Sequence, residues 1–130
     1  MQVSRELDYG VRAVFVLAKS DNSILSKRKI AEEFSIPVNF LAIILPKLVH
    51  AGIVSSLPGP KGGYRLAKPA TEISIFDVIC SINEAFAFNK CLDLAKGCEF
   101  MEKCPVRPHW EKVQNYSENY LKGVTFDSLI

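Results

Sequence analysis

Apolar residues recur at helical spacing near the start of the chain, at positions 7, 11, 14, 15 and 18. This period places them on one face of an amphipathic helix, which we expect to span residues 5–19. Ser4 lies just before it, where a hydroxyl oxygen can accept a hydrogen bond from the backbone of the first turn. A second, shorter helix is predicted after Ser26, which can cap it in the same way.

The segment Ser35-Ile-Pro37 ends this second helix and starts a third. Proline suits the first turn of a helix because the backbone N–H that it lacks has no partner there. The third helix is predicted to end near Gly52, with a kink at Pro46, where the missing donor costs about 3 kcal/mol in a regular helix. Two short helices joined by a tight turn are typical of a helix-turn-helix motif.

Alternating apolar and polar residues follow the third helix and predict two β-strands, at 53–57 and 64–67. Between them lies Pro58-Gly-Pro-Lys-Gly-Gly63, whose prolines and glycines favour a turn that closes a β-hairpin. A hairpin directly after a helix-turn-helix is a wing. Residues 1–84 are therefore predicted to form a winged helix-turn-helix domain.

Two more helices are predicted in the second half of the chain. Ser74 and Asp77 form a capping-box pattern at the start of the first. The second is long, and its apolar stripe includes Trp110, Val113 and Tyr120. This stripe can be buried against the same helix of a second copy or against the chain's own first helix. We therefore expect a mainly α fold with a β-hairpin wing and a long C-terminal dimerisation helix with a tail, in residues 106–130.

The net charge is only +2 at pH 7, but the charges are unevenly distributed. Residues 22–68 carry seven basic and two acidic side chains, whereas residues 69–130 carry six basic and nine acidic ones. A basic middle segment suits a nucleic-acid partner, although solvated helix faces would give the same pattern. The first residues lack the apolar stretch of a signal peptide, and no apolar run reaches the roughly 18 residues of a membrane span. A cytoplasmic protein that binds no membrane is therefore expected.

Three cysteines, Cys91, Cys98 and Cys104, lie close together in a segment rich in charged residues. In a reducing compartment such thiols hold zinc or an iron-sulfur cluster more often than they form disulfides, and soft thiolates select these metals. Their spacing differs from that of zinc ribbons and ferredoxins, so packing in a core is an alternative. The charged neighbours argue against burial, and residues 85–105 are therefore predicted to form a cysteine-rich metal-binding loop.

Several residues of the predicted winged domain have side chains suited to DNA. Asn39 carries an amide that can form two hydrogen bonds with an adenine edge, and Phe40 can touch a thymine methyl or face the core. Basic side chains supply charge for phosphates, and adjacent glycines in the hairpin turn allow close approach to the DNA backbone. These candidates are Lys27, Arg28, Lys47 and Lys61 for the phosphates, and Gly62 and Gly63 for the close approach. Because few exposed side chains can bond to bases, DNA shape is expected to contribute to specificity.

Four features of the chain occur together: Leu7-Asp-Tyr-Gly-Val-Arg-Ala13, Ile36-Pro-Val-Asn-Phe-Leu41, Gly59-Pro-Lys-Gly-Gly-Tyr64, and the three cysteines before Trp110. In this combination the chain resembles the small winged-helix bacterial transcription regulators of the IscR/NsrR type. The resemblance covers nearly the whole chain. It implies a homodimer that binds a palindromic, double-stranded DNA operator with two winged domains and carries an iron-sulfur cluster in the cysteine loop of each subunit.

The resemblance leaves the fourth ligand of such a cluster open. IscR-like members have a histidine three residues after the last cysteine, where this chain has Arg107, and its nearest histidine is His109. NsrR-like members have a carboxylate at the position of Asp8, which reaches the partner subunit's cluster, and an arginine at the position of Arg12. Asp8 is therefore the expected ligand, unless it only forms an ion pair with Arg12. The alternatives are His109, an exogenous thiol, and Cys80, which is otherwise expected to be a buried thiol.

The sequence has no glycine-rich phosphate loop and no nucleophile elbow, so no enzymatic activity and no small-molecule substrate are expected. The leading hypothesis is a DNA-binding transcriptional regulator, expected to be a repressor. Its iron-sulfur cluster would sense redox state, nitric oxide or iron and cluster status. Two alternatives remain open. One is a winged-helix regulator whose cysteines bind zinc or react with oxidants as thiols, and the other is an electron-carrier or cluster-delivery protein.

Overall fold

The computed structural model describes residues 2–83 and 86–130 and is mainly α-helical, as predicted. In chain order the elements are α1 (Arg5–Lys19), α2 (Lys27–Glu33), α3 (Val38–His50), β1 (Val54–Leu57), β2 (Gly63–Leu66), η1 (Ala70–Glu72), α4 (Ile75–Ile82), η2 (Lys90–Leu92), α5 (Arg107–Lys122) and η3 (Phe126–Leu129). In the described part of the chain, no single helix has the length and apolar composition of a membrane span. Helices α2 and α3 have that length and apolar composition only when they are taken together, and the chain is sharply bent between them.

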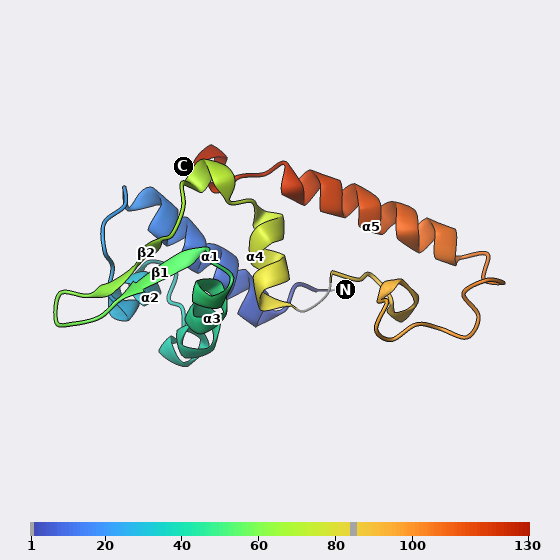
Figure 1. Cartoon of the computed structure of the whole chain (residues 1–130), viewed down its shortest axis with the longest axis horizontal. Helices are drawn as coiled ribbons and strands as arrows, with labels where there is room; N and C mark the ends of the chain where they lie inside the picture. The colour runs from blue at the N-terminus through green and yellow to red at the C-terminus, as the bar shows by residue number, and fades with distance from the viewer. Residues whose placement is uncertain (1, 84–85) are drawn as a thin grey trace.

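The elements are arranged as a winged domain with one long helix attached to it. Figure 1 shows α1 to α4 and the hairpin β1–β2 grouped together, while α5 extends away from them. The segment that carries the cysteines lies beside the end of α5 that is farthest from α4. The predicted winged helix-turn-helix fold with a long C-terminal helix is therefore confirmed. The predicted boundary between residues 84 and 85 lies outside the described residues.

Serine side chains cap the starts of α1, α2 and α4, as predicted. The hydroxyl oxygens of Ser4 and Ser26 each accept a hydrogen bond of 3.2 Å from the backbone N–H three residues later. At α4 the capping box is complete, because Ser74 accepts from the Asp77 backbone and the Asp77 carboxylate accepts from the Ser74 N–H. These bonds satisfy donors that the start of a helix leaves without partners.

A tight turn joins α2 to α3, and the two helices are bent by 114° at this point. Across the turn, the Ile36 N–H donates to the Ala31 carbonyl at 2.9 Å, and Ser35 adopts a left-handed conformation with φ 50°. This pattern ends many helices, usually with glycine at the left-handed position. The side chain of Ile36 is buried in the core and anchors the turn. The resulting angle is typical of a helix-turn-helix motif.

Helix α3 runs through Pro46 without a break. Pro46 leaves the carbonyl of Ala42 without its helical partner, and the kink predicted there stays a prediction. Both residues are exposed, so water can bond to that carbonyl, and the helix continues. The opposite face of α3 is buried and consists of Leu41, Ile44, Leu45 and Leu48.

The hairpin is fixed to the chain that precedes α2. Strand β1 pairs antiparallel with β2, and Leu57 lies opposite Gly63 at the turn end. Two backbone hydrogen bonds of 2.8 and 2.9 Å join Tyr64 to Leu25. Gly63 has φ +151° at this junction, and a Cβ atom there would lie 2.4 Å from the Leu25 carbonyl oxygen. Only glycine can therefore occupy this position without displacing the wing.

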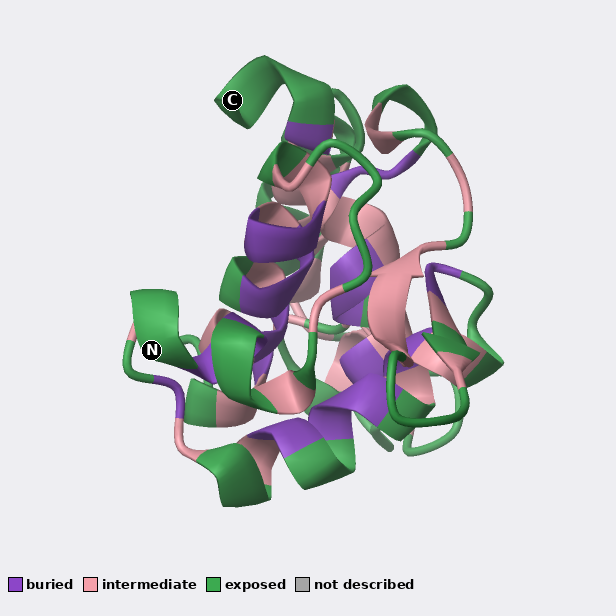
Figure 2. Ribbon diagram, turned by 90° about the vertical axis from the view of Figure 1, so that its left-hand side faces the viewer, coloured by how far each residue is buried: buried purple, intermediate pink, exposed green. Residues whose placement is uncertain are grey.

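The core lies on the facing sides of α1, α3 and α4, and the end of the chain completes it. Figure 2 shows the buried residues on the inward sides of the helices. Phe126 in η3 is fully buried in the same core. Its backbone N–H donates to the Ile73 carbonyl at 3.0 Å, and the Ile75 N–H donates to the Val124 carbonyl at 2.9 Å. The tail after α5 therefore packs on the winged domain.

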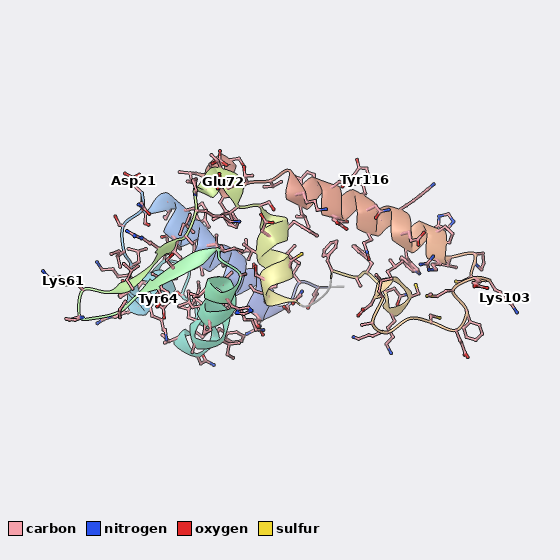
Figure 3. All side chains as sticks on the ribbon, in the orientation of Figure 1. Asp21, Lys61, Tyr64, Glu72, Lys103 and Tyr116 are labelled. Atoms are coloured by element: carbon pink, nitrogen blue, oxygen red, sulfur yellow. The ribbon has the colours of Figure 1, made fainter. Side chains whose placement is uncertain are left out.

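The described residues of the chain leave the apolar stripe of α5 uncovered. None of the residues of α5 is buried, and the helix packs against α4 and η2 rather than being buried against α1. Trp110, Val113, Tyr116 and Tyr120 have exposed fractions of 37, 43, 81 and 66%. Figure 3 shows Tyr116 pointing away from the rest of the molecule.

We expect Gly63→Ala to destabilise the fold, because the added Cβ would collide with the Leu25 carbonyl. The free energy of unfolding should fall by roughly 2 to 4 kcal/mol, as measured by urea denaturation. Gly59→Ala is the matched control. Gly59 also has a positive φ, +97°, but a Cβ atom added there would have no other atom within 4 Å. The control should lose only about 1 kcal/mol, and equal losses in both variants would contradict the steric explanation.

Candidate functional site

The exposed side of α3 carries the residue predicted to contact a base. Asn39 is the second residue of this helix and is exposed, so its amide can reach a base edge. Phe40 points the other way. Its ring packs edge to face against Tyr9 of α1, with 5.0 Å between the ring centroids, and the residue is half-buried. Phe40 thus lies on the core side of α3, the second of the two positions that the sequence leaves open for it, and its contact with a thymine methyl stays a prediction.

Exposed cations lie on α2 and at the tip of the hairpin. Figure 3 shows Lys61 at the end of the hairpin farthest from α5, with its side chain in solvent. On α2, Arg28 lies 3.4 Å from Glu32, but their side chains are 89% and 64% exposed. Such an exposed ion pair is weak, so Arg28 can exchange it for a phosphate. Lys27, beside it at the start of α2, is half-exposed.

The two glycines of the turn have a structural role in the hairpin. A Cβ atom on Gly62 would lie 2.1 Å from the carbonyl oxygen of Leu57. The Gly62 N–H also donates to the Gly59 carbonyl at 2.9 Å, which closes the turn. Gly62 and Gly63 therefore shape the wing that presents Lys61, whatever their own distance from DNA.

Lys47 joins neighbouring helices, and its predicted contact with a phosphate stays a prediction. Its Nζ atom forms an ion pair of 2.5 Å with Glu6 of α1 and lies 3.4 Å from the carbonyl of Ile82, the last residue of α4. A cavity of about 860 Å³ separates this group from the cysteine segment and is lined on that side by Asp93 and Lys96. Sequence reasoning missed this link because Glu6 and Lys47 are 41 residues apart and no local pattern connects them.

The three predicted cysteine ligands line one cavity. Cys91, Cys98 and Cys104 surround a volume of about 300 Å³ together with Met101 and Trp110. All three are free thiols; Cys98 is exposed and the other two are half-buried. Within residues 2–83 and 86–130, no three His, Cys, Asp or Glu side chains are grouped closely enough to hold a single metal ion. The arrangement is therefore an open set of soft donors, wider than the ligand shell of one ion.

Local hydrogen bonds and α5 position the cysteine segment. The Phe88 backbone N–H donates to Gln114 of α5 at 2.9 Å, which ties the start of the segment to that helix. Asn89 caps the short helix η2, and the Asp93 carboxylate accepts from the backbone of residue 95 at 3.0 Å. Gly97 has φ +61°, which turns the chain just before Cys98. The thiols are thus presented by successive turns rather than by one rigid element.

Neither Asp8 nor His109 lines the cysteine cavity in the described part of the chain. Asp8 forms an ion pair of 3.0 Å with Arg12, and both side chains are nearly half-exposed. Figure 1 places α1 and the cysteine segment in separate parts of the molecule. The Asp8 side chain is thus partly exposed to solvent, and it lies far from the thiols of its own chain. His109 is exposed in the first turn of α5.

Cys80 is exposed on α4, so the prediction of a buried structural thiol is wrong. The buried side of α4 is occupied by Val78, Ile79 and Ile82, and the helical turn directs residue 80 outward. Partial burial, together with the nearby carboxylates of Asp77 and Glu118, raises the pKa of the Cys80 thiol. A protonated thiol is a poor metal ligand and a poor nucleophile. Cys80 also does not line the cysteine cavity as the structure describes it.

Arg107 lies three residues after Cys104, where IscR-like members have a histidine. Its guanidinium forms an ion pair of 2.7 Å with Glu111, one turn along α5. Its Nε atom is buried and has no hydrogen-bond acceptor among the described residues. A buried donor without an acceptor is unusual, but Arg107 is not among the residues that line the cysteine cavity.

Comparison with known proteins assigns the chain to a family. A family model described as an iron-dependent transcriptional regulator, Rrf2, matches residues 3–130. A candidate helix-turn-helix-type transcriptional regulator of Aquifex aeolicus is 33% identical over 132 residues, which cover 100% of this chain and 92% of that protein. This similarity favours a regulator over an electron carrier or cluster-delivery protein.

Solved structures agree with this assignment. The structure of T. potens IscR has a TM-score of 0.81 and 28% identity, and the match covers 99% of this chain and 85% of that one. The oxidized form of Staphylococcus aureus CymR has a TM-score of 0.73 and 28% identity, covering 99% and 95% of the two chains. The chain therefore belongs to the Rrf2 family of winged-helix, DNA-binding transcriptional regulators.

Proposed function

We propose that this regulator binds its operator with an affinity set by an iron-sulfur cluster held by Cys91, Cys98 and Cys104. The observation that supports this most strongly is the single cavity lined by the three free thiols. Thiolates are the usual ligands of iron-sulfur clusters. The cluster would supply a site that oxidants, nitric oxide or iron shortage can alter or remove.

The geometry suits a cluster better than a single zinc ion. A structural zinc site needs four ligands around one atom at about 2.0 to 2.3 Å. The described residues contain no such group. A cluster spreads its ligands over several metal atoms, so three thiols around one cavity suit it better than they suit a zinc ion.

We further propose that two copies pair through α5. The exposed stripe of Trp110, Val113 and Tyr120 is larger and more apolar than the exposed side of a solvated helix usually is. A twin α5 would cover it and place two winged domains side by side, as a palindromic operator requires. In such a dimer the carboxylate of Asp8, which is remote from its own cysteines, would be the fourth ligand for the partner's cluster.

The polar contacts of Lys47 connect the recognition helix with the elements that lead to the cluster site. It bonds to Glu6, two residues before Asp8, and to the end of α4, from which the chain continues to the cysteines. A shift of α1 at Asp8 would therefore move Glu6 and, through Lys47, the C-terminal half of α3. Ligand loss at the cluster site could thus change the position of the recognition helix.

A second candidate is a regulator that responds to oxidants through its thiols alone. The similarity to the oxidized form of Staphylococcus aureus CymR supports it, as does the exposure of Cys98. Exposed thiols can form disulfides or sulfenic acid. Metal content separates the two candidates directly.

Protein purified without oxygen should contain iron and acid-labile sulfide in similar amounts and absorb visible light. Cys98→Ser should lose both iron and sulfide, because the cluster would lose one of its few ligands. Cys80→Ser is the matched control and should retain them, since Cys80 lies outside the cavity. One zinc per chain without sulfide, or no metal after anaerobic reconstitution, would contradict the cluster and favour the thiol alternative.

Asp8→Ala should retain a cluster but alter its absorption and electron paramagnetic resonance spectra. A carboxylate is a harder ligand than a thiolate, so its replacement changes the iron that it binds. His109→Ala should have the spectra of the parent protein. The assignment fails if Asp8→Ala is spectroscopically unchanged and His109→Ala is altered. In that case the Asp8–Arg12 pair is an ordinary surface ion pair.

The two DNA-contact predictions differ in kind. Asn39→Ala should weaken binding by about 1 to 3 kcal/mol at one base-pair position, whereas Lys61→Ala should weaken binding to every sequence. The Lys61 variant should also reduce the slope of log affinity against log salt by about 0.9, because one phosphate contact is lost. Fluorescence anisotropy at several salt concentrations measures both effects. A changed visible spectrum in either variant would show that the DNA surface has been misplaced.

A further inference from the structure

The outward face of the recognition helix α3 is almost entirely apolar. The exposed residues of its first three turns are Val38, Asn39, Ala42, Ile43 and Pro46. Of these, only Asn39 has a side chain that can form hydrogen bonds. Val38 and Ile43 expose 54% and 51% of their surfaces. A helix in the position of a DNA-recognition helix thus presents hydrocarbon to the solvent.

Packing within the chain does not require this composition. The core side of α3 is already filled by buried aliphatic residues, and Phe40 packs on Tyr9 beside them. The outward positions could therefore be polar without any loss of core contacts. Exposed aliphatic side chains in one group indicate contact with a partner.

The surroundings of this face favour DNA as that partner. Helix α3 contains no acidic residue, and its last turn carries Lys47 and His50. The adjacent elements carry exposed cations at Lys29 and Lys61. Exposed cations around a helix bent by 114° from its predecessor match the way helix-turn-helix proteins enter the major groove. The outward residues of α3 carry no charge themselves, so the charge around this face comes from the side chains of the adjacent elements.

The chemistry of the major groove then limits which bases fit. The only apolar group on its base edges is the C5-methyl of thymine, and an asparagine amide matches the N6 and N7 atoms of adenine. Both belong to the same A·T pair. A G·C pair opposite Ile43 would instead lose water from its polar groups without gaining a partner, which is unfavourable. No outward residue among Val38, Ala42 and Pro46 could bond to such a pair through its side chain.

We infer that α3 recognises a short run of A·T pairs, with Ile43 and Val38 packed on thymine methyls and Asn39 bonded to an adenine. Asn39 and Ile43 are one helical turn apart, about 6 Å along the axis. Because a recognition helix lies within the major groove, side chains this close together contact neighbouring base pairs, and the two contacts fall within one short sequence. Because this recognition requires DNA binding through α3, it rests on the DNA-binding function given above.

The inference can be tested by removing methyl groups from DNA. The full-length protein, purified without oxygen, is first used to select its preferred sites from a pool of random duplexes. Each thymine of the selected half-site is then replaced by uracil, which lacks only the methyl and keeps every hydrogen-bonding group. Uracil opposite Ile43 should lower affinity by roughly twofold to fivefold, the expected effect of one buried methyl group.

Two variants show whether α3 is responsible. Ile43→Ala should reduce the preference for thymine over uracil at one position to near onefold, with little effect on folding because Ile43 is half-exposed. Lys61→Ala is the matched control and should lower affinity for thymine and uracil duplexes by the same factor. A preference for thymine that survives in Ile43→Ala would overturn the assignment to Ile43.

Two results would overturn the inference itself. One is equal affinity for thymine and uracil at every position of the half-site. The other is selection of sites whose major-groove contacts are mostly G·C pairs. If no sequence is enriched and no salt-dependent binding occurs, the failure lies instead in DNA binding by this chain, which is a separate outcome.

Discussion

The close approach of α4 to α1 at Gly10 fixes the arrangement on which the rest of the molecule depends. A Cβ atom at Gly10 would lie 2.0 Å from the Cδ1 atom of Ile82 and 3.5 Å from Ile44 of the recognition helix. The absence of a side chain there lets three helices meet. Ile82 is also the residue whose carbonyl Lys47 approaches, so the core contact and the polar link share one location. The position of α3 is therefore coupled to the helices that lead to Asp8 and to the cysteines.

The proposed DNA-contact residues and the proposed sensing thiols lie at opposite ends of the molecule. Under this proposal, affinity for DNA comes from cations on α2 and at the hairpin tip, and the discrimination between bases comes from the apolar face of α3. The thiols lie near the far end of α5, in a segment that only short turns and Gln114 hold in place. A weakly held segment can respond to chemistry at its cysteines, while the core around Gly10 keeps the DNA-binding domain folded.

The sequence predicts most of the fold because its signals are local. Ser4, Ser74 and Asp77 cap their helices as expected, and the glycines of the turn close the hairpin. The features that it does not predict depend on contacts between distant residues. The link from Glu6 to Lys47, the burial of Phe126 and the outward direction of Cys80 all require the packed structure. Gathering of the three cysteines at one cavity agrees with the sequence, but metal binding there is still a prediction.

The central claim is that the state of the cluster controls operator affinity. Fluorescence anisotropy on one selected operator, at fixed salt, should compare the anaerobically purified protein with the same preparation after chelation of its iron. A typical allosteric coupling of about 1 to 3 kcal/mol predicts a difference of roughly fivefold to 150-fold between the two forms. Equal affinities for the operator, with iron present in one form and absent from the other, would contradict the account.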